Sequence, residues 1–406
     1  MHSFSGTRTT VASAGVPWSI YAVLFASTSV IVGVLWDISW HRSIGRDTFW
    51  SAPHIAIYAC GVLAGISSAY LIFVSAFRAR SAGAAASTEL AGVADERRRE
   101  RPALRNSGVR IWGLSGPIGA FISAWGGMAM LVSAPFDDWW HNAYGLDVKI
   151  ISPPHMVLAT GFFGIEFGTI MLLLAFMNRA SDRLRTRLQW LFLYVGGTTV
   201  CESLLIKLEY ISRPEMHGAL FYIVVAIGTP AIMVALAIAS RQRWACTTMA
   251  AVYTAFGVGF LWILPLFAAE PKLGPVFHQV THFIPWEFPL LLIVPALIVD
   301  LILQRTDGWR PIVRALATGA AFLATFIIVQ WPFANFLMTP LARNRVFGTT
   351  YFDYSTSARS LYARYVFLPA AAPAQFWRGM LIALAVSSVM MWIGLRAGRG
   401  MQRIQR

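Results

Sequence analysis

Charged residues are scarce in this sequence: they make up 13% of its 406 residues, whereas hydrophobic residues make up 57%. A chain this apolar could not hide its hydrophobic side chains in one or two soluble cores without leaving large exposed patches. Cysteine is also rare, and the three cysteines lie in or beside apolar runs without CxxC spacing. This pattern indicates small buried side chains rather than a disulfide framework.

The charged residues are mostly basic, with 33 Lys and Arg against 19 Asp and Glu, which gives a net charge of +14. Arg97, Arg98, Arg99 and Arg101 share one connecting segment, but no aromatic residues alternate with them to stack on bases. We therefore expect no nucleic-acid partner, and we attribute the charge to the excess of Arg in cytoplasmic connectors of membrane proteins. The stretch before Pro17 lacks the order of a cleaved signal peptide, so the first apolar run is expected to be a retained span.

Apolar runs long enough to cross a bilayer, which takes about 20 residues, recur along the whole chain. Backbone polar groups in lipid must be satisfied within the segment, so these runs predict an all-α polytopic membrane protein with about ten transmembrane helices in tandem hairpins. The expected spans are residues 17–37, 53–77, 113–136, 154–177, 188–209, 217–239, 246–268, 287–304, 312–332 and 375–395.

Connectors that carry Arg alternate with connectors that are poor in it. The Arg-bearing connectors are residues 78–110, 178–187, 240–243, 305–314 and 396–406. This alternation predicts cytoplasmic termini and a multi-pass protein of the inner (plasma) membrane, surrounded by lipid. The connector 333–374 is outward by parity despite its Arg residues, because long loops follow the charge rule weakly. Its aromatic residues, from Tyr351 to Tyr365, predict an ordered cap.

One group of residues occurs twice, 100 residues apart. The copies are Asp37-x-x-Trp40-His41-x3-Gly45-x-Asp47 with Ser51-x-Pro53-His54, and Asp137-x-x-Trp140-His141-x3-Gly145-x-Asp147 with Ser152-x-Pro154-His155. In each copy the first Asp and the first His are four residues apart at the end of a helix, so their side chains share one face. The second His follows a proline, which is favoured in the first turn of a helix, so a hairpin brings it beside the first pair. One carboxylate and two imidazoles are the ligand set of a metal site with a free coordination position.

A membrane-interface belt is the competing interpretation, because tryptophans such as Trp36 are typical of headgroup depth, where Asp and His also cap helices. Repetition of the whole spacing favours metal ligands. Asp138 competes with Asp137 for the carboxylate role, although the repeat favours Asp137. Asp47 and Asp147 lie in the connectors, where a turn or a hydrogen bond to a ligand imidazole would use them.

Further candidate ligands follow later in the chain. Glu209 ends one expected span and His217 opens the next, while His278 and His282 are spaced for chelation on a helix. In the expected topology these histidines lie on the outward side together with those of the two clusters. They are therefore candidates for additional metal ligands.

Two acidic residues, Glu166 and Glu202, fall within expected spans, where an ionisable group is costly and indicates a function. Glu166 lies about three helical turns beyond His155 on roughly the same face, which predicts a proton relay leading from the second cluster. The alternatives are a buried carboxyl hydrogen-bonded to a neighbouring helix, or pairing of Glu202 with Lys207.

The doubled cluster resembles the C subunit of the copper-dependent membrane monooxygenases, the family of the particulate methane, ammonia and hydrocarbon enzymes. The resemblance covers about residues 20–180 and rests on the two triads and their spacings, Asp37-x3-His41-x12-His54 and Asp137-x3-His141-x13-His155. It implies copper at both triads, other monooxygenase subunits as partners and a homo-oligomer. The family has asparagine at the position of Asp137 and fewer spans, so the resemblance implies nothing about the later helices.

We therefore divide the chain into a duplicated-hairpin metal-binding region, residues 1–180, and additional transmembrane helices, residues 181–406, with an outward loop at about 333–374. The expected function is copper binding in support of O2-dependent oxidation of a small apolar substrate. Iron and zinc are the alternative metals, since both accept imidazole and carboxylate. The alternative functions are copper handling or sensing without turnover, and metal transport, which is disfavoured because the ligands cluster at one surface rather than at the midplane.

Overall fold

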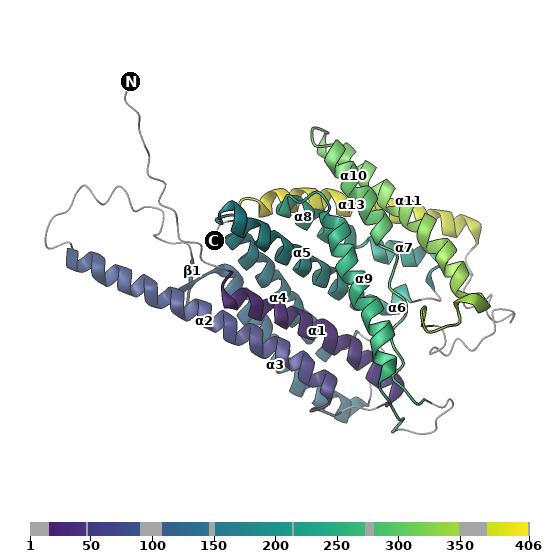
Figure 1. The fold of residues 1–406 in the computed structure, drawn as a ribbon, viewed down its shortest axis with the longest axis horizontal. Helices are drawn as coiled ribbons and strands as arrows, with labels where there is room; N and C mark the ends of the chain where they lie inside the picture. The colour runs from purple at the N-terminus through teal and green to yellow at the C-terminus, as the bar shows by residue number, and fades with distance from the viewer. Residues whose placement is uncertain are drawn as a thin grey trace.

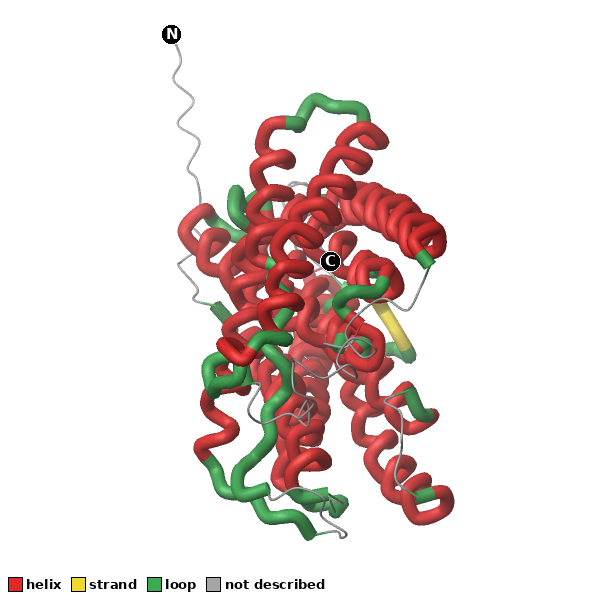
Figure 2. Tube along the Cα trace, turned by 90° about the vertical axis from the view of Figure 1, so that its right-hand side faces the viewer, coloured by secondary structure: helices red, strands yellow, loops and turns green. Residues whose placement is uncertain are grey.

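The computed structural model describes residues 16–45, 48–89, 108–145, 151–212, 215–272, 280–348 and 372–404. These residues are mostly helical, with a single pair of short strands among them (Figure 2). Eight helical segments within the described part are long and apolar enough to cross a membrane. Large apolar side chains such as Phe25, Phe73 and Trp125 are exposed on their surfaces, as lipid contact requires. The chain is an all-α polytopic membrane protein.

Four long helices form two consecutive hairpins that lie side by side (Figure 1). They are α1 (Trp18–Ser43), α2 (Ala52–Glu89), α3 (Ile118–Tyr144) and α4 (Pro153–Met177). Glycines allow α3 and α4 to pack backbone against backbone: a Cβ added to Gly126 would lie 2.6 Å from the carbonyl oxygen of Gly161. Small residues at such contacts are the usual basis of helix association in membranes.

A two-stranded antiparallel hairpin precedes α3, formed by β1 (Val109–Ile111) and β2 (Leu114–Gly116). Its turn residues, Trp112 and Gly113, both have positive φ, as a two-residue hairpin turn requires. The third membrane helix therefore begins at Ile118, after Pro117, and not at residue 113 as expected.

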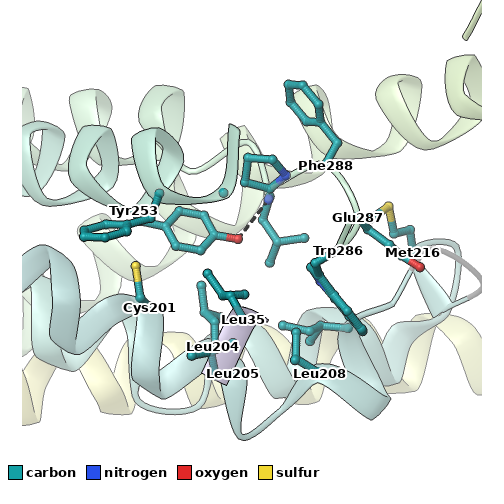
Figure 3. A pocket seen from close by; sticks show the side chains of 15 residues that line it. Leu35, Cys201, Leu204, Leu205, Leu208, Met216, Tyr253, Trp286, Glu287 and Phe288 are labelled. Atoms are coloured by element: carbon teal, nitrogen blue, oxygen red, sulfur yellow. Dashed lines mark hydrogen bonds between the residues drawn. The ribbon is translucent and has the colours of Figure 1, made fainter. Parts of the chain in front are cut away.

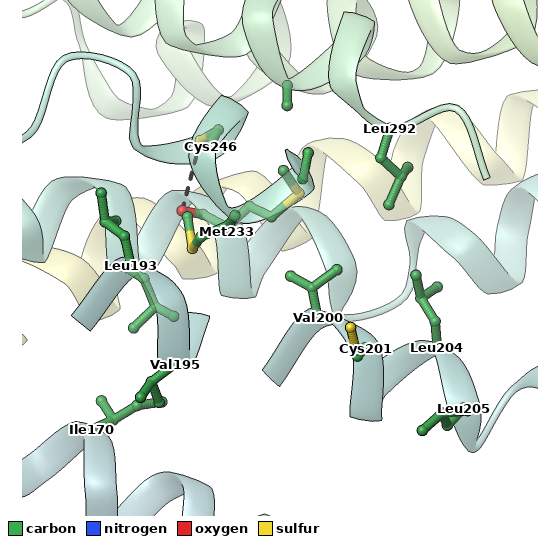
Figure 4. Close-up of a cluster of buried hydrophobic side chains, with 14 of the residues drawn as sticks. Ile170, Leu193, Val195, Val200, Cys201, Leu204, Leu205, Met233, Cys246 and Leu292 are labelled. Carbon is green, nitrogen blue, oxygen red and sulfur yellow. Dashed lines mark hydrogen bonds between the residues drawn. The ribbon is translucent and has the colours of Figure 1, made fainter. Parts of the chain in front are cut away.

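The described part of the second half adds eight helical segments. They are α5 (Asp182–Leu205), α6 (Leu208–Ile211), α7 (Ala219–Ala226), α8 (Thr229–Ser240), α9 (Ala245–Ile263), α10 (Ile293–Arg305), α11 (Pro311–Leu337) and α13 (Pro373–Met401), with 3-10 turns η2 (Leu264–Leu266) and η3 (Pro340–Ala342). Helix α5 lies at the centre, where Val195 and Val200 belong to one buried cluster with Ile170 of α4 and Met233 of α8 (Figure 4). The two halves thus share a continuous core.

Two of the expected spans in this half differ from simple helices. The span 217–239 is broken between α7 and α8, where Gly228 has φ of +80°. The span 287–304 is helical only from Ile293, because Pro285 and Pro289 keep the chain before it extended. The aromatic segment from Tyr351 to Tyr365, expected to form a cap, lies outside the described residues.

Hydrogen bonds from polar side chains connect the Arg-bearing turns to one another. Asn178, just after α4, donates hydrogen bonds to the carbonyl oxygens of Met401 and Ile404. Gln189 of α5 donates to the carbonyl oxygen of Ser240, and Arg243 donates to Gln304 at the end of α10. Four connecting regions therefore meet at one end, opposite the start of α4.

Candidate metal centre

The second hairpin brings the carboxylate of Asp137 and the imidazoles of His141 and His155 to one point. Asp137 and His141 lie one turn apart near the end of α3, and His155 lies in the first turn of α4 after Pro153 and Pro154. The Nε2 atom of His141 is 3.4 Å from one oxygen of Asp137, and the Nε2 atom of His155 is 3.5 Å from the other. One ligand atom from each of the three residues lies within 4.8 Å of the others.

The first hairpin repeats the two contacts between carboxylate and imidazole. Helix α1 continues to Ser43, six residues beyond its expected end, so Asp37 and His41 both lie on it, and His54 lies in the first turn of α2. The Nε2 atoms of His41 and His54 are 3.6 Å and 3.5 Å from the two oxygens of Asp37. In the first triad the carboxylate thus lies beside both imidazoles, but only in the second do ligand atoms of all three residues lie within 4.8 Å of one another among the described residues.

The N···O separations at the two triads fit metal ligands better than hydrogen bonds. All four lie between 3.4 and 3.6 Å, longer than the roughly 2.7–2.9 Å of a charge-assisted N–H···O hydrogen bond. Two ligand atoms bound at about 2.05 Å to one ion are about 3.3 Å apart in tetrahedral geometry and about 3.5 Å apart in trigonal geometry. Each imidazole therefore has the spacing of a ligand that shares an ion with its carboxylate, and in the second hairpin the ligand atoms of all three residues also lie within 4.8 Å of one another.

The two sites differ in which imidazole is accessible. In the first hairpin the side chain of His41 is 38% exposed and that of His54 is 15% exposed. In the second hairpin the order is reversed, with 13% for His141 and 34% for His155. Each site thus has one imidazole held inside the hairpin and one facing the surroundings.

Both sites lie at the same end of the helix bundle. Helices α2 and α3 are antiparallel, because Gly61 of α2 lies against Gly127 of α3 while Ile72 of α2 lies against Gly116, before α3. The start of α2, which carries His54, is therefore beside the end of α3, which carries Asp137. This end is opposite the Arg-bearing turns.

A loop from the second half covers the end of α1; we call residues 264–272 and 280–290 the capping loop. The Oγ of Ser39 donates a hydrogen bond of 2.5 Å to the carbonyl oxygen of Ile284, and the Oγ of Ser43 accepts one of 2.7 Å from the Ile284 N–H. The guanidinium of Arg42 lies 4.2 Å from the ring centroid of Trp286. Spacing in the sequence gave no indication of this contact, since its partners are more than 240 residues apart.

The other candidate ligands are dispersed. His217 is buried, and its Nε2 lies 2.8 Å from the Oδ1 of Asn335 on α11, beside the ring of Trp331. His282 lies in extended chain, paired with Ala268, so the helical i, i+4 geometry does not apply to it. Glu209 lies on α6. His278, Asp47 and Asp147 lie outside the described residues.

Glu166 and Glu202 are both buried inside the bundle. Glu166 accepts a hydrogen bond of 3.1 Å from the Oγ of Ser27 on α1, which matches the alternative of a carboxyl bonded to a neighbouring helix. On its face of α4, the positions between it and His155 are the apolar Ala159 and Phe162. The relay from the second site therefore stays a prediction.

Lys207 does not pair with Glu202. Its ammonium instead donates hydrogen bonds to the Oγ of Ser203 and to the carbonyl oxygen of Ile227, at the break between α7 and α8.

A mostly apolar cavity of about 50 Å³ lies between α1, α5, α6, α9 and the capping loop. Its lining includes Leu35, two residues before Asp37, together with Cys201 and Leu205 of α5 (Figure 3). The hydroxyl of Tyr253 accepts a hydrogen bond from the Leu290 N–H at its edge.

Comparison with known proteins gave no match: no family model, no curated protein and no solved structure is similar to this chain. The interpretation of the site therefore depends on its own geometry and on the spacing of its residues.

Proposed function

We propose that the protein is a membrane metalloprotein that binds one transition-metal ion in each hairpin. The ligands would be Asp37, His41 and His54 in the first site and Asp137, His141 and His155 in the second. The observation that carries the proposal is the N···O separation of 3.4 to 3.6 Å at both contacts of each carboxylate, with all three ligand atoms of the second triad within 4.8 Å of one another. Three ligands leave a coordination position for a small molecule.

Copper is the metal that we propose, with iron and zinc as alternatives, since imidazole nitrogen suits all three. The preference for copper comes from the spacing of the two triads, which resembles that of the monooxygenase C subunits. On the same ground we propose that the protein supports O2-dependent oxidation of a small apolar substrate, with other monooxygenase subunits or further copies of itself as partners. An apolar substrate would reach the sites through the lipid that surrounds the helices.

We further propose ten crossings, an inner-membrane location, cytoplasmic termini and sites on the extracytoplasmic side. Eight of the crossings would be the apolar segments described above. The other two would be α5, and α10 together with the extended residues before it. The Arg-bearing turns gather at the end away from the triads, which supports this orientation by the positive-inside rule.

Metal analysis of the purified protein tests the proposal. His54→Ala and His155→Ala are each expected to lose about one equivalent of bound metal, because each variant removes a ligand from a different site. His282→Ala, an exposed histidine outside both triads, is the matched control and is expected to keep full occupancy. Unchanged metal content in both triad variants would refute the proposal.

Copper handling or sensing without turnover is the second candidate function. It is favoured by the exposure of one imidazole in each site, 38% for His41 and 34% for His155, through which a metal could be exchanged with a partner. Oxygen consumption by copper-loaded membranes separates the two candidates. Consumption that is lost in both His41→Ala and His141→Ala supports oxidation, and its absence in the wild type supports handling.

A further inference from the structure

Two carboxylates lie deep inside the helix bundle, away from both triads. Glu166 of α4 and Glu202 of α5 each have 1% of their surface exposed. Helices α4 and α5 pack against each other, and the thiols of Cys60 on α2 and Cys201 on α5 are buried in the same interior. Ionised carboxylates in such a place are costly, and two that share a site disfavour double ionisation.

Glu202 has no hydrogen-bond partner for either carboxylate oxygen among the described residues. The nearest ammonium in sequence, that of Lys207, is directed to Ser203 and Ile227 instead. A buried carboxyl group without such partners is favoured in its protonated, neutral form. No positive charge or hydrogen-bond donor in the described part of the chain would stabilise its negative charge.

The other groups that face the pair do not supply a charge. Besides the thiols of Cys60 and Cys201, they are the phenol of Tyr194 on α5 and, beside Cys201, the phenol of Tyr253 on α9. Helix α1 contributes the hydroxyls of Ser27, bonded to Glu166, and of Thr28, bonded to Tyr194, and α5 contributes the hydroxyl of Thr198 beside Glu166. Thiols and phenols are neutral near pH 7 in apolar surroundings. The ligand that suits this set is therefore a proton.

We propose that Glu166 and Glu202 form a proton-binding pair in the interior of the membrane region, whose proton exchanges with the aqueous phase. The cavity beside α1 is lined on α5 by Cys201, Leu204 and Leu205 but not by Glu202 itself, and it is large enough for a water molecule (Figure 3). A water molecule there would lie beside the turn of α5 that carries Glu202. The inference is independent of the metal sites, since neither glutamate belongs to a triad.

Labelling with the apolar reagent dicyclohexylcarbodiimide tests the pair in the purified protein in lipid vesicles. The O–H of a protonated carboxyl adds across a C=N bond of the reagent, and the adduct rearranges to a stable N-acylurea without a leaving group. Peptide mass mapping of the wild type is expected to find the label at Glu202 or Glu166. The rate should fall about tenfold per pH unit above the midpoint, because only the protonated form reacts.

Glu202→Gln and Glu166→Gln should each remove the label from their own position, and the better-hydrated Glu215 is the internal control. Absence of label at both glutamates in the wild type would overturn the proposal. A rate that is independent of pH would show a static structural proton and overturn it too. Suppression of labelling by sodium at constant pH would identify a metal-cation site instead. The results that would overturn the proposal are all measured on the wild type, and none depends on bound copper.

Discussion

At each triad a single carboxylate is shared by two imidazoles, one contact for each of its oxygens. In the second hairpin Asp137 faces His141 through one oxygen and His155 through the other. Its negative charge would offset part of the charge of a bound cation, and its oxygen would be one of three ligand atoms. Asparagine has the same shape without the charge, so it isolates this contribution.

We predict that Asp137→Asn lowers the metal affinity of the second site by at least about 10- to 100-fold, the usual loss when even an outer partner of a ligand is removed. The first site should be unaffected, because Asp37 belongs to a separate hairpin. Titration of the variant with metal should therefore resolve one tight and one weakened site. Two tight sites would show that the negative charge of Asp137 is not required for tight binding.

Acid should release the metal from both sites. Imidazole binds metal only when neutral, so protons compete for two nitrogens at each ion. We predict that the apparent affinity falls steadily as the pH is lowered from neutral, with a slope approaching two protons per ion. Equilibrium dialysis at a series of pH values measures it, and affinity independent of pH would exclude imidazole ligands.

Spacing alone was sufficient to find the triads, because Asp, His and the proline that precedes the second His occupy fixed positions on helix ends. It could not find the capping loop, since the contact of Ser39 with Ile284 joins distant parts of the chain. Nor could it show that Lys207 is directed to the break at Ile227 rather than to Glu202. Such contacts depend on how helices pack, which local sequence does not specify.

At the scale of elements, the second site depends on how closely α3 packs on α4, because each helix supplies part of the triad. Gly126 of α3 is packed directly on the backbone of α4: an added Cβ would lie 2.6 Å from the carbonyl oxygen of Gly161 and 2.7 Å from the nitrogen of Ile165. A Cβ added to Gly65 of α2, in contrast, would have no atom of another described helix within 4 Å. The two glycines form a matched pair.

We predict that Gly126→Ala destabilises the protein by about 1–3 kcal/mol, because the two helices must separate to admit the methyl group. Gly65→Ala is expected to be neutral or slightly stabilising, since alanine favours the helix. Thermal unfolding in detergent, with metal content measured alongside, compares the two. Equal stability of the two variants would show that close packing of α3 and α4 is not required.

The apolar runs predict most of the helices, but they do not predict where a helix is interrupted or begins late. The break before Gly228 falls inside a continuous apolar run, where one glycine is a weak indication. The late start of α10 had a clearer indication in Pro285 and Pro289, and the strand pair before α3 had one in Gly113. Apolar length predicts that a segment lies in the membrane, whereas glycine and proline decide where it is helical.

At the scale of the whole molecule, one end of the bundle carries both triads and the other carries the Arg-bearing turns. Ala143 is exposed near the second triad, and Arg399 is exposed on α13 near the contacts of Asn178 with the C-terminal residues. The three native cysteines are all buried, so added cysteines can be labelled with little background.

We predict that an impermeant thiol reagent labels Ala143→Cys in intact, right-side-out membrane vesicles, and labels Arg399→Cys only after permeabilisation. This follows from the positive-inside rule applied to the two ends. The unmodified protein serves as the blank. The reverse pattern would place the triads on the cytoplasmic side. It would not contradict the proposal that the triads bind metal.

We propose that each hairpin holds one ion between a carboxylate and two imidazoles. Pulsed electron paramagnetic resonance of the copper(II)-loaded protein tests it most directly, because the remote nitrogen of each bound imidazole modulates the signal. We predict two coupled imidazoles per copper in the wild type, and about half as much imidazole-coupled copper in His155→Ala or His54→Ala, because each variant loses one ion. Imidazole coupling that is absent in the wild type, or an amount of imidazole-coupled copper that is unchanged in both variants, would contradict the proposal.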